Sequence, residues 1–413
     1  MLKFPDFRKL WLGQSISVFG TQIVGLAYPV LAVLLLGATE FQMGILNAAD
    51  NAAFLFFGLF AGVWVDRWRK RDVMIIGDLV RFLAVLSIPI LWFVGVLEVW
   101  HLIALGFIMG IATLFFDVAY QSYIPILFPE DKIAPANSAL ETTNQLANLG
   151  GPSIAGFLLT IFKAPLLILV DAVSFLGSVI ALTLIKDEEV PKPKAERRSV
   201  KAEILEGLRF VWMQKYIRSI SFTTSTSNFF STLAFTLTPL LYLRDLEMSP
   251  ATFGILGSLS AIGGLAGAMS TTKLIQWFGE GPVIAGSAVT SGLSACLVPV
   301  AINFEGITQI AMLALSGIIN TFTILSYNIT QVSARQRICP QELLGRMNAS
   351  IRFFVWGVMP IAAVLSGALG EVIGIIPTIW IGSIGVVFAA TFVLFSPLSR
   401  EKYLQSQIKT TEN

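Results

Sequence analysis

Long apolar segments recur along all 413 residues of the chain, and they restrict its fold more than any other feature. Only 13% of the residues are charged, whereas about 25% is typical of a soluble protein, and the mean hydropathy is +0.76. Backbone groups in lipid must form hydrogen bonds within their own helix, so a membrane span needs about 20 mostly apolar residues. The pattern predicts an all-α membrane protein.

Twelve segments are long and apolar enough to be predicted spans. The first half contains 11–36, 42–64, 73–96, 100–125, 138–162 and 165–185, and the second contains 217–243, 250–275, 281–302, 307–333, 349–370 and 373–396. We predict an N-terminal six-helix bundle over 1–185, a cytosolic linker with an amphipathic helix over 186–216, a C-terminal six-helix bundle over 217–398, and a cytosolic tail over 399–413.

The distribution of positive charge predicts the orientation of these spans. With the N-terminus inside, 24 of the 28 lysines and arginines fall on the cytosolic side, including nine over residues 186–218. Only Lys163 and Arg244 fall outside, and Arg81 and Arg352 fall within spans. Cytosolic loops carry an excess of Lys and Arg. We therefore expect an even number of spans and both termini in the cytosol.

One short loop, between the predicted second and third spans, holds four cations and one acid in six residues. Its main residues are Gly62, Asp66, Arg67, Lys70 and Arg71. A carboxylate such as Asp66 can sit on the positive N-terminus of a helix from the other half, a contact that contributes about 0.3–1 kcal/mol. That contact exists only while the cytosolic side is closed, so these residues are a candidate conformational latch. The alternative is that the cluster only sets the orientation.

The two halves also repeat a short pattern. Proline, acid and asparagine recur at matching places in 129–137, after the fourth predicted span, and in 340–348, after the tenth, 211 residues later. This spacing supports a parallel repeat about an axis normal to the membrane.

On these residues the chain resembles the major facilitator superfamily. Gly62, Asp66, Arg67, Lys70 and Arg71 match the superfamily's loop between spans two and three, although Arg69 stands where a second glycine is usual. The run 151–156, Gly-Pro-Ser-Ile-Ala-Gly, resembles a fifth-span motif of exporters. Together with 120–125 and Asn137-Ser138, it is similar to the twelve-span drug:proton antiporter branch, which includes macrolide-efflux proteins and the enterobactin exporter.

The resemblance implies a fold and a function. It implies twelve transmembrane helices in two pseudo-symmetric six-helix bundles, and a secondary active exporter of amphiphilic small molecules (drugs, macrolides or siderophores) that works by alternating access. It further implies a monomer in the prokaryotic cytoplasmic membrane, with a small-molecule substrate and membrane lipid as partners. Proton antiport stays open, because the fourth-span arginine of many proton-coupled exporters is absent and Met109 lies near its expected place.

Several charged residues lie within the predicted spans, where each costs about 2.5–3.5 kcal/mol or more and needs a reason. Asp50 has no obvious cationic partner at its depth, so it is a candidate titrating or cation-binding group, a hydrogen-bonded structural acid beside Asn51, or an exposed residue at the rim. Asp117 is expected to pair with Arg81, with Asp78 sharing that cation, or to bind substrate or a proton. Asp171 and Glu371 lie near the outer ends and are expected to be solvated.

Polar residues at helical spacing predict the lining of a cavity. The resemblance implies that spans one, four, seven and ten line the central path, and polar stripes on those spans share one helix face each. The candidate substrate-cavity residues are Thr21, Tyr28, Thr113, Tyr120, Asn228, Asn320 and Tyr327.

The fifth span contains a candidate hinge at Gly151, Pro152 and Gly156. Proline removes a helix hydrogen bond and glycine removes a side chain, so either a bend or a close helix contact is expected. Span eight offers small residues at helical spacing, beginning at Gly257. The two faces either slide during transport or pack statically.

Other function classes have little support in the sequence. The chain contains one histidine, His101, and no phosphate-binding Gly-x-x-x-x-Gly-Lys-Ser/Thr loop. We therefore expect no enzyme activity, no catalytic residues, no cofactor, no metal site and no nucleic-acid partner. The main alternative to an exporter is a facilitative or proton-coupled importer of a small solute with the same fold, since fold does not fix direction.

Overall fold

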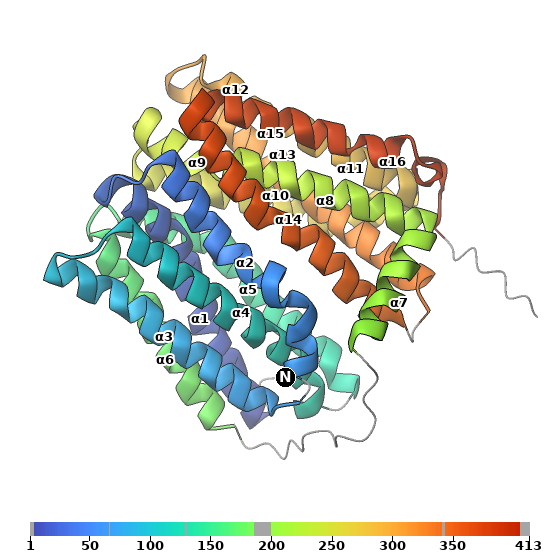
Figure 1. The fold of residues 1–413 in the computed structure, drawn as a ribbon, viewed down its shortest axis with the longest axis horizontal. Coiled ribbons are helices and arrows are strands. Elements are labelled where there is room, and N and C mark those ends of the chain that lie inside the picture. The colour runs from blue at the N-terminus through green and yellow to red at the C-terminus, as the bar shows by residue number, and fades with distance from the viewer. Residues whose placement is uncertain (1–3, 66, 129, 186–199, 341–342, 405–413) are drawn as a thin grey trace, which may run out of the picture. The chain divides into compact units, whose positions relative to one another are not determined.

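The computed structural model describes residues 4–65, 67–128, 130–185, 200–340 and 343–404, and nearly all of them are helical (Figure 1). Before the linker the helices are α1 (Pro5–Val30), the π-helix η1 (Leu31–Leu35), α2 (Glu40–Val65), α3 (Lys70–Val94), α4 (Val99–Leu127), α5 (Glu130–Leu158) and α6 (Ala164–Thr183).

After the linker a second series follows. It consists of α7 (Val200–Met213), α8 (Lys215–Phe235), α9 (Thr238–Leu240), the π-helix η3 (Leu241–Asp245), α10 (Pro250–Phe278), α11 (Glu280–Ala295), α12 (Leu297–Ala301), α13 (Gly306–Ile338), α14 (Leu344–Ile373), α15 (Ile375–Ala389), α16 (Thr391–Leu394) and the 3₁₀-helix η5 (Pro397–Arg400).

Every predicted span coincides with one helix or with a short series of them, so the all-α prediction is confirmed. Within the described residues, nine helical segments are long and apolar enough to cross a membrane. The other three predicted spans correspond to α2, α5 and the series from α8 to η3. The amphipathic helix expected in the linker is α7, whereas 186–199 lie outside the described residues.

The chain divides into two compact units. The first contains Met1–Arg197 together with Thr238–Ser258, and the second contains Arg198–Leu237 together with Leu259–Asn413. The segment 238–258, which belongs by sequence to the predicted C-terminal bundle, therefore packs with the first unit.

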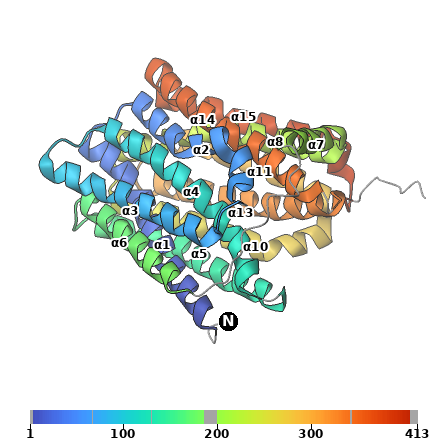
Figure 2. The same cartoon turned by 60° about the horizontal axis from the view of Figure 1, so that its bottom comes forward.

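In the first unit, α6 packs against both α1 and α3, and α2 packs against α4, as both views show (Figure 1 and Figure 2). Cations near the start of the chain and of α3 cap the C-terminus of α6. Arg71 donates to the carbonyls of Leu182 at 2.9 Å and Thr183 at 2.6 Å, and Lys9 donates to Leu184 O at 2.8 Å. The last carbonyls of a helix lack the usual partner four residues further on, so the cations stabilise this end of α6.

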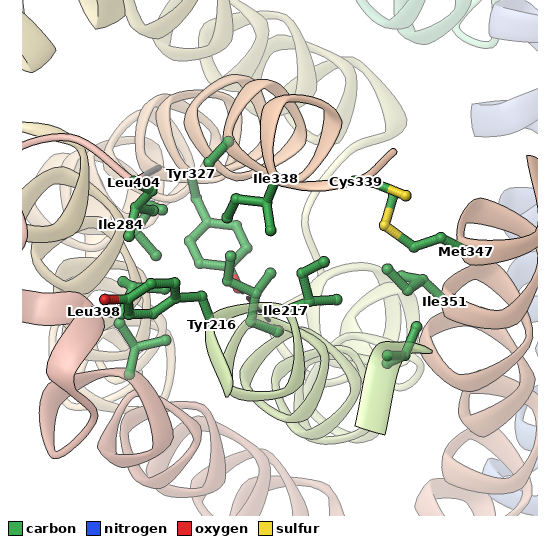
Figure 3. Close-up of a cluster of buried hydrophobic side chains, with 14 of the residues drawn as sticks. Tyr216, Ile217, Ile284, Tyr327, Ile338, Cys339, Met347, Ile351, Leu398 and Leu404 are labelled. Atoms are coloured by element: carbon green, nitrogen blue, oxygen red, sulfur yellow. Dashed lines mark hydrogen bonds between the residues drawn. The ribbon is translucent and has the colours of Figure 1, made fainter. Parts of the chain in front are cut away.

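In the second unit, a buried apolar cluster joins α8, α13 and α14 to the C-terminal segment. Figure 3 shows Tyr216 and Ile217 of α8 facing Tyr327 and Ile338 of α13, with Leu398 and Leu404 at the same cluster. The C-terminal segment is also held by polar contacts, because the Leu404 N–H donates to Glu280 Oε2 at 2.9 Å. Residues up to Leu404 are thus part of the packed unit.

The repeat predicted from sequence recurs in the backbone geometry. η1 ends in the bonds from Leu36 N to Leu31 O and from Ala38 N to Ala32 O, and η3 ends in the same pair of bonds 210 residues later. The bonds run at 3.1 and 2.9 Å after η1, and both are 2.8 Å after η3. α2 and α10 then begin at Glu40 and Pro250, again 210 residues apart. The two halves therefore share a local design at the same end of their first helix.

Candidate functional site

A polar cavity of about 710 Å³ lies in the first unit between α1, α4 and α5. α1 contributes Gln14, Ser15 and Val18, α4 contributes Phe116, Asp117, Tyr120 and Gln121, and α5 contributes Asn137, Ser138, Leu140, Glu141, Thr143 and Asn144. The α4 residues recur at spacings of three and four, which puts them on one face of the helix. The size and the mixed lining suit a drug-sized ligand.

The cavity wall carries two acids and no lysine or arginine among the residues that line it. The side chains of Asp117 and Glu141 are both exposed. Tyr120 stacks on Phe116 with ring centroids 6.0 Å apart, which gives the wall an aromatic side. The cavity therefore combines negative charge, amide groups and aromatic surface.

Two of these residues accept hydrogen bonds from neighbouring side chains. Trp11 donates to Thr143 Oγ1 at 3.0 Å and links α1 to α5, and within α5 the Gln145 amide donates to Glu141 Oε1 at 2.5 Å. Of the predicted cavity residues, only Tyr120 lines this space, together with the predicted charge Asp117. Gln14, Glu141 and Asn144 were not predicted, although their polar character in an apolar chain was a signal.

The other predicted cavity residues lie elsewhere. Tyr28 donates to Leu102 O at 2.6 Å, Asn228 donates to Val355 O at 3.0 Å, and Asn320 is buried and donates to Ser291 Oγ at 3.2 Å. Tyr327 is 9% exposed and shares a 2.7 Å hydrogen bond with Thr224. Thr21 donates to Asp171 Oδ1 at 3.5 Å, and Thr113 is half-buried on α4.

Asp50 lies at the close crossing of α2 and α4. The Asp50 backbone carbonyl packs on Gly110, and the Asp50 carboxylate packs on Gly106 beside the Tyr28 hydroxyl. Among the described residues, none forms a hydrogen bond or ion pair with this carboxylate. The role of Asp50 stays a prediction.

Arg81 pairs with Asp78. The guanidinium donates to Asp78 Oδ1 at 2.5 Å and lies 4.1 Å from the ring centroid of Phe116. Asp117 lines the polar cavity, and its pairing with Arg81 stays a prediction.

The expectation that Asp171 is solvated is wrong. Its side chain is 1% exposed and accepts a hydrogen bond from Ser174 Oγ at 2.9 Å, because α6 turns this residue toward α1 and α3. Glu371 is exposed, as expected.

The candidate latch is described in part. Asp66 lies outside the described residues, Gly62 and Arg67 are exposed, and Lys70 is 6% exposed. Arg71 caps α6, and Lys70 donates to Trp68 O at 3.4 Å, so both residues have contacts within their own unit. The latch itself stays a prediction.

The candidate hinge forms a close helix contact. A Cβ on Gly151 would lie 2.5 Å from Gln22 Cβ of α1, and a Cβ on Gly156 would lie 2.7 Å from Pro250 O of α10. Pro152 packs on Gly254 and Gly257 of α10, and the Ser153 hydroxyl donates to Ser258 Oγ at 2.8 Å. α5 runs unbroken through Pro152, so the close contact is the alternative that this structure contains.

Two bundles of apolar helices and an internal polar cavity define a membrane transporter with the major facilitator fold. More narrowly, the chain belongs to the family described as "Transmembrane secretion effector", whose model matches residues 2–411.

Curated relatives of this chain are efflux proteins. Multidrug efflux pump Tap of Mycolicibacterium fortuitum is 24% identical over 94% of this chain and 95% of its own length. Macrolide efflux protein A of Streptococcus pyogenes is 24% identical over 89% of this chain and 90% of its own. Enterobactin exporter EntS of Salmonella typhimurium is 25% identical over 94% of this chain and 92% of its own length.

Solved structures share the fold at low identity. A bacterial homologue of the iron transporter ferroportin in its inward-facing state aligns with a TM-score of 0.77 at 16% identity, over 96% of this chain and 99% of the other. A D-xylose-proton symporter aligns with a TM-score of 0.70 at 13% identity, over 97% of this chain and 99% of the other. At these identities the likeness shows the fold alone.

Proposed function

We propose that this chain is a secondary active exporter of amphiphilic small molecules that works by alternating access. The observation that carries the proposal is the polar cavity between α1, α4 and α5, together with three relatives named as efflux proteins or exporters that match this chain along nearly their whole length. An internal cavity among membrane helices gives a solute a binding place, and a family of exporters supports the direction.

The chemistry of the cavity supports a substrate that is partly apolar and carries positive charge. Phe116 and Tyr120 offer aromatic surface, while Asp117 and Glu141 offer negative charge. Cations are attracted both to carboxylates and to aromatic faces. A macrolide with a protonated amine fits this description, and an anionic siderophore fits it less well.

We further propose a monomer in the prokaryotic cytoplasmic membrane, surrounded by lipid, with both termini in the cytosol. The asymmetry of lysine and arginine between the two sides supports the orientation. The proposed drive is proton antiport, since one charge that moves through 100 mV supplies about 2.3 kcal/mol.

The test is efflux of a radiolabelled macrolide from proteoliposomes with and without an imposed pH gradient. We expect efflux from the side of the cytosolic termini, accelerated by the gradient. Transport that persists without any response to the gradient would contradict proton antiport. Net uptake in the opposite direction would favour an importer instead.

Variants of the cavity test the site. Asp117→Asn and Glu141→Gln are each expected to raise the KM for the cationic macrolide several-fold, because each removes one attraction for the amine. The matched control is Glu371→Gln, which neutralises an exposed acid outside the cavity. Equal effects of all three substitutions would argue against the cavity as the binding place.

A further inference from the structure

A buried group of charged side chains lies where α3, α6 and α1 meet, apart from the polar cavity. Asp78 is 0% exposed, Asp171 is 1% exposed and Arg81 is 7% exposed. Asp171 lies seven residues after the first residue of α6, roughly 10 Å along the helix axis at 1.5 Å per residue. The group is thus well inside the unit.

Each carboxylate has one satisfied oxygen and one that is not. Asp78 Oδ1 accepts from Arg81 at 2.5 Å, and Asp171 Oδ1 accepts from Ser174 at 2.9 Å. Asp78 Oδ2 and Asp171 Oδ2 are buried and have no hydrogen-bond partner among the described residues. Two donors of the same group, Arg81 Nε and Ser178 Oγ, are likewise unpaired in the described part of the chain. Buried polar atoms are normally paired, so the hydrogen bonding of this group is incomplete on both its donor and its acceptor side.

The charges of the group do not balance. On α3 and α6, the ionisable side chains that face one another are Asp78, Arg81 and Asp171. α1 presents Gly20 and the Thr21 hydroxyl to Asp171, while α4 presents Phe116 to Arg81, with Asp117 beyond it in the polar cavity. Two ionised carboxylates beside one guanidinium leave one net negative charge away from water, which is unfavourable.

We propose that Asp171 and Asp78, which share the charge of Arg81, hold one exchangeable proton between them. A proton on either carboxyl cancels the net charge and turns one orphan acceptor into a donor. No bond other than O–H forms or breaks, and the proton comes from water. Because like charges in one site cannot both ionise cheaply, the two acids act as a pair.

The packing disfavours a metal cation in the same place. A Cβ built on Gly20 would lie 2.6 Å from Asp171 Oδ1 and 2.5 Å from Ser174 Oγ, so α1 closes directly over the carboxylate. A sodium ion needs several oxygen ligands around it, whereas a proton needs none of that space.

Two contacts connect this group to the polar cavity. The guanidinium of Arg81 lies on the ring of Phe116, which lines the cavity, and Ser15 of α1 lines both the cavity and the apolar groove that holds Gly20 and Ser174. A change of charge at Asp171 therefore acts on a wall of the cavity. Use of this proton to drive export rests on the proposed function, whereas its binding does not.

The experiment is infrared difference spectroscopy of the purified full-length protein during a pH titration, with the band of the protonated carboxyl C=O as readout. We expect a band that persists at pH values where exposed carboxyls are ionised and that disappears on alkalinisation. Both Asp171→Asn and Asp78→Asn are expected to lose it, because either substitution leaves one carboxylate for one guanidinium. Glu371→Gln, which removes an exposed acid, is the control and keeps the band.

Several results would overturn the proposal. They are a band that survives either asparagine variant, a band that never titrates, or a band in the wild type that sodium chloride removes and choline chloride does not. If an asparagine variant fails to fold, Asp171→Glu is the replacement test. This variant is expected to shift the band rather than remove it, and an unshifted band would contradict the proposal. Absence of transport in the wild-type protein would count against the proposed function and leave the infrared result standing.

Discussion

Gly20 on α1 is the residue on which the approach of α1 to α6 depends. It lies over Asp171 and Ser174, and a side chain there would meet both of them. Gly25, on the same helix, has no atom within 4 Å of the position that a Cβ would take. The same substitution at the two positions therefore separates crowding from a change of helix propensity.

Gly20→Ala is expected to destabilise the protein by about 1–3 kcal/mol, because α1 must move away from α6. It is also expected to lower the rate of macrolide efflux. Gly25→Ala is the matched control and is expected to be neutral or slightly stabilising. Thermal unfolding in detergent and efflux from proteoliposomes provide the two measurements, and equal stability of the two variants would contradict the packing argument.

Arg81 is the cation on which both buried acids depend. Arg81→Ala is expected to cost about 3–5 kcal/mol, the usual penalty for leaving buried charge without its partner. Adding Asp78→Asn to this variant is expected to restore part of the loss, because one acid is removed as well. Thermal unfolding of the single and double variants forms the cycle. A double variant that is less stable than Arg81→Ala alone would refute the shared-charge picture.

The sequence could have indicated the burial of Asp171, although the prediction placed it in water. Asp171, Ser174 and Ser178 share one face of α6, and α1 carries Gly13 and Gly20 seven residues apart, which pack on that face. A polar stripe opposite a glycine stripe predicts a close polar crossing. Distance from the helix end, which was used instead, gives depth in the membrane but not the neighbour.

At the scale of elements, the contact between α5 and α10 is the closest match to a sequence prediction. Small residues on the fifth and eighth spans were expected to face each other, and Pro152 packs on Gly254 and Gly257. Gly264, farther along α10, faces Thr321 and Leu325 of α13 instead. α10 therefore packs its glycines on two different helices, α5 and α13. The spacing of glycines in the sequence does not show which glycine faces which helix.

Gly254→Ala is expected to disturb the α5–α10 contact, because the new Cβ would meet the carbonyl oxygen of Pro152, a backbone atom that cannot turn aside. We expect a loss of about 1–3 kcal/mol of stability and slower transport. Gly264→Ala, where the nearest atom is 3.7 Å away, is the control on the same helix. The same assays apply, and an unchanged Gly254→Ala variant would show that this contact is not tight.

At the scale of the whole molecule, an ion pair joins residues from both sides of the linker. Arg244 of η3 donates to Glu40 Oε1 of α2 at 2.7 Å, and both residues belong to the first compact unit. Burial raises the pKa of Glu40, but the hydrogen bond and charge of Arg244 outweigh this, so the pKa lies below the usual value for glutamate. The contribution of the pair is present above that usual value and is lost as pH falls through the lowered pKa.

If the transporter alternates, the segment 238–258 must part from Glu40 in one of its states. A reducible bifunctional thiol reagent that links Glu40→Cys to Arg244→Cys, in a background with Cys296 and Cys339 replaced, is expected to abolish transport until the link is reduced. Singly substituted variants treated with the same reagent are the controls. Loss of this partly exposed ion pair costs at most about 1 kcal/mol of stability. Transport that continues in the cross-linked protein would show that the contact need not open.

The fold followed from the sequence more fully than the site did. Span limits depend on composition averaged over twenty residues, so errors at single positions cancel. The polar stripes of spans seven and ten were assigned to a cavity, yet Asn320 lies against α11 and Tyr327 bonds Thr224. Polar residues in lipid must be satisfied by some partner, and the periodicity does not say whether that partner is another helix or a solute.

The two wide helical turns, η1 and η3, carry a consequence for descent. Each is followed by a residue with left-handed backbone, Gly37 at φ 62° in the first half and Glu247 at φ 50° in the second. Such a dihedral suits glycine and is unfavourable for glutamate. Duplication and fusion of an ancestral six-helix gene explains this pattern. The left-handed bend is kept in both halves, although the second half no longer has a glycine there.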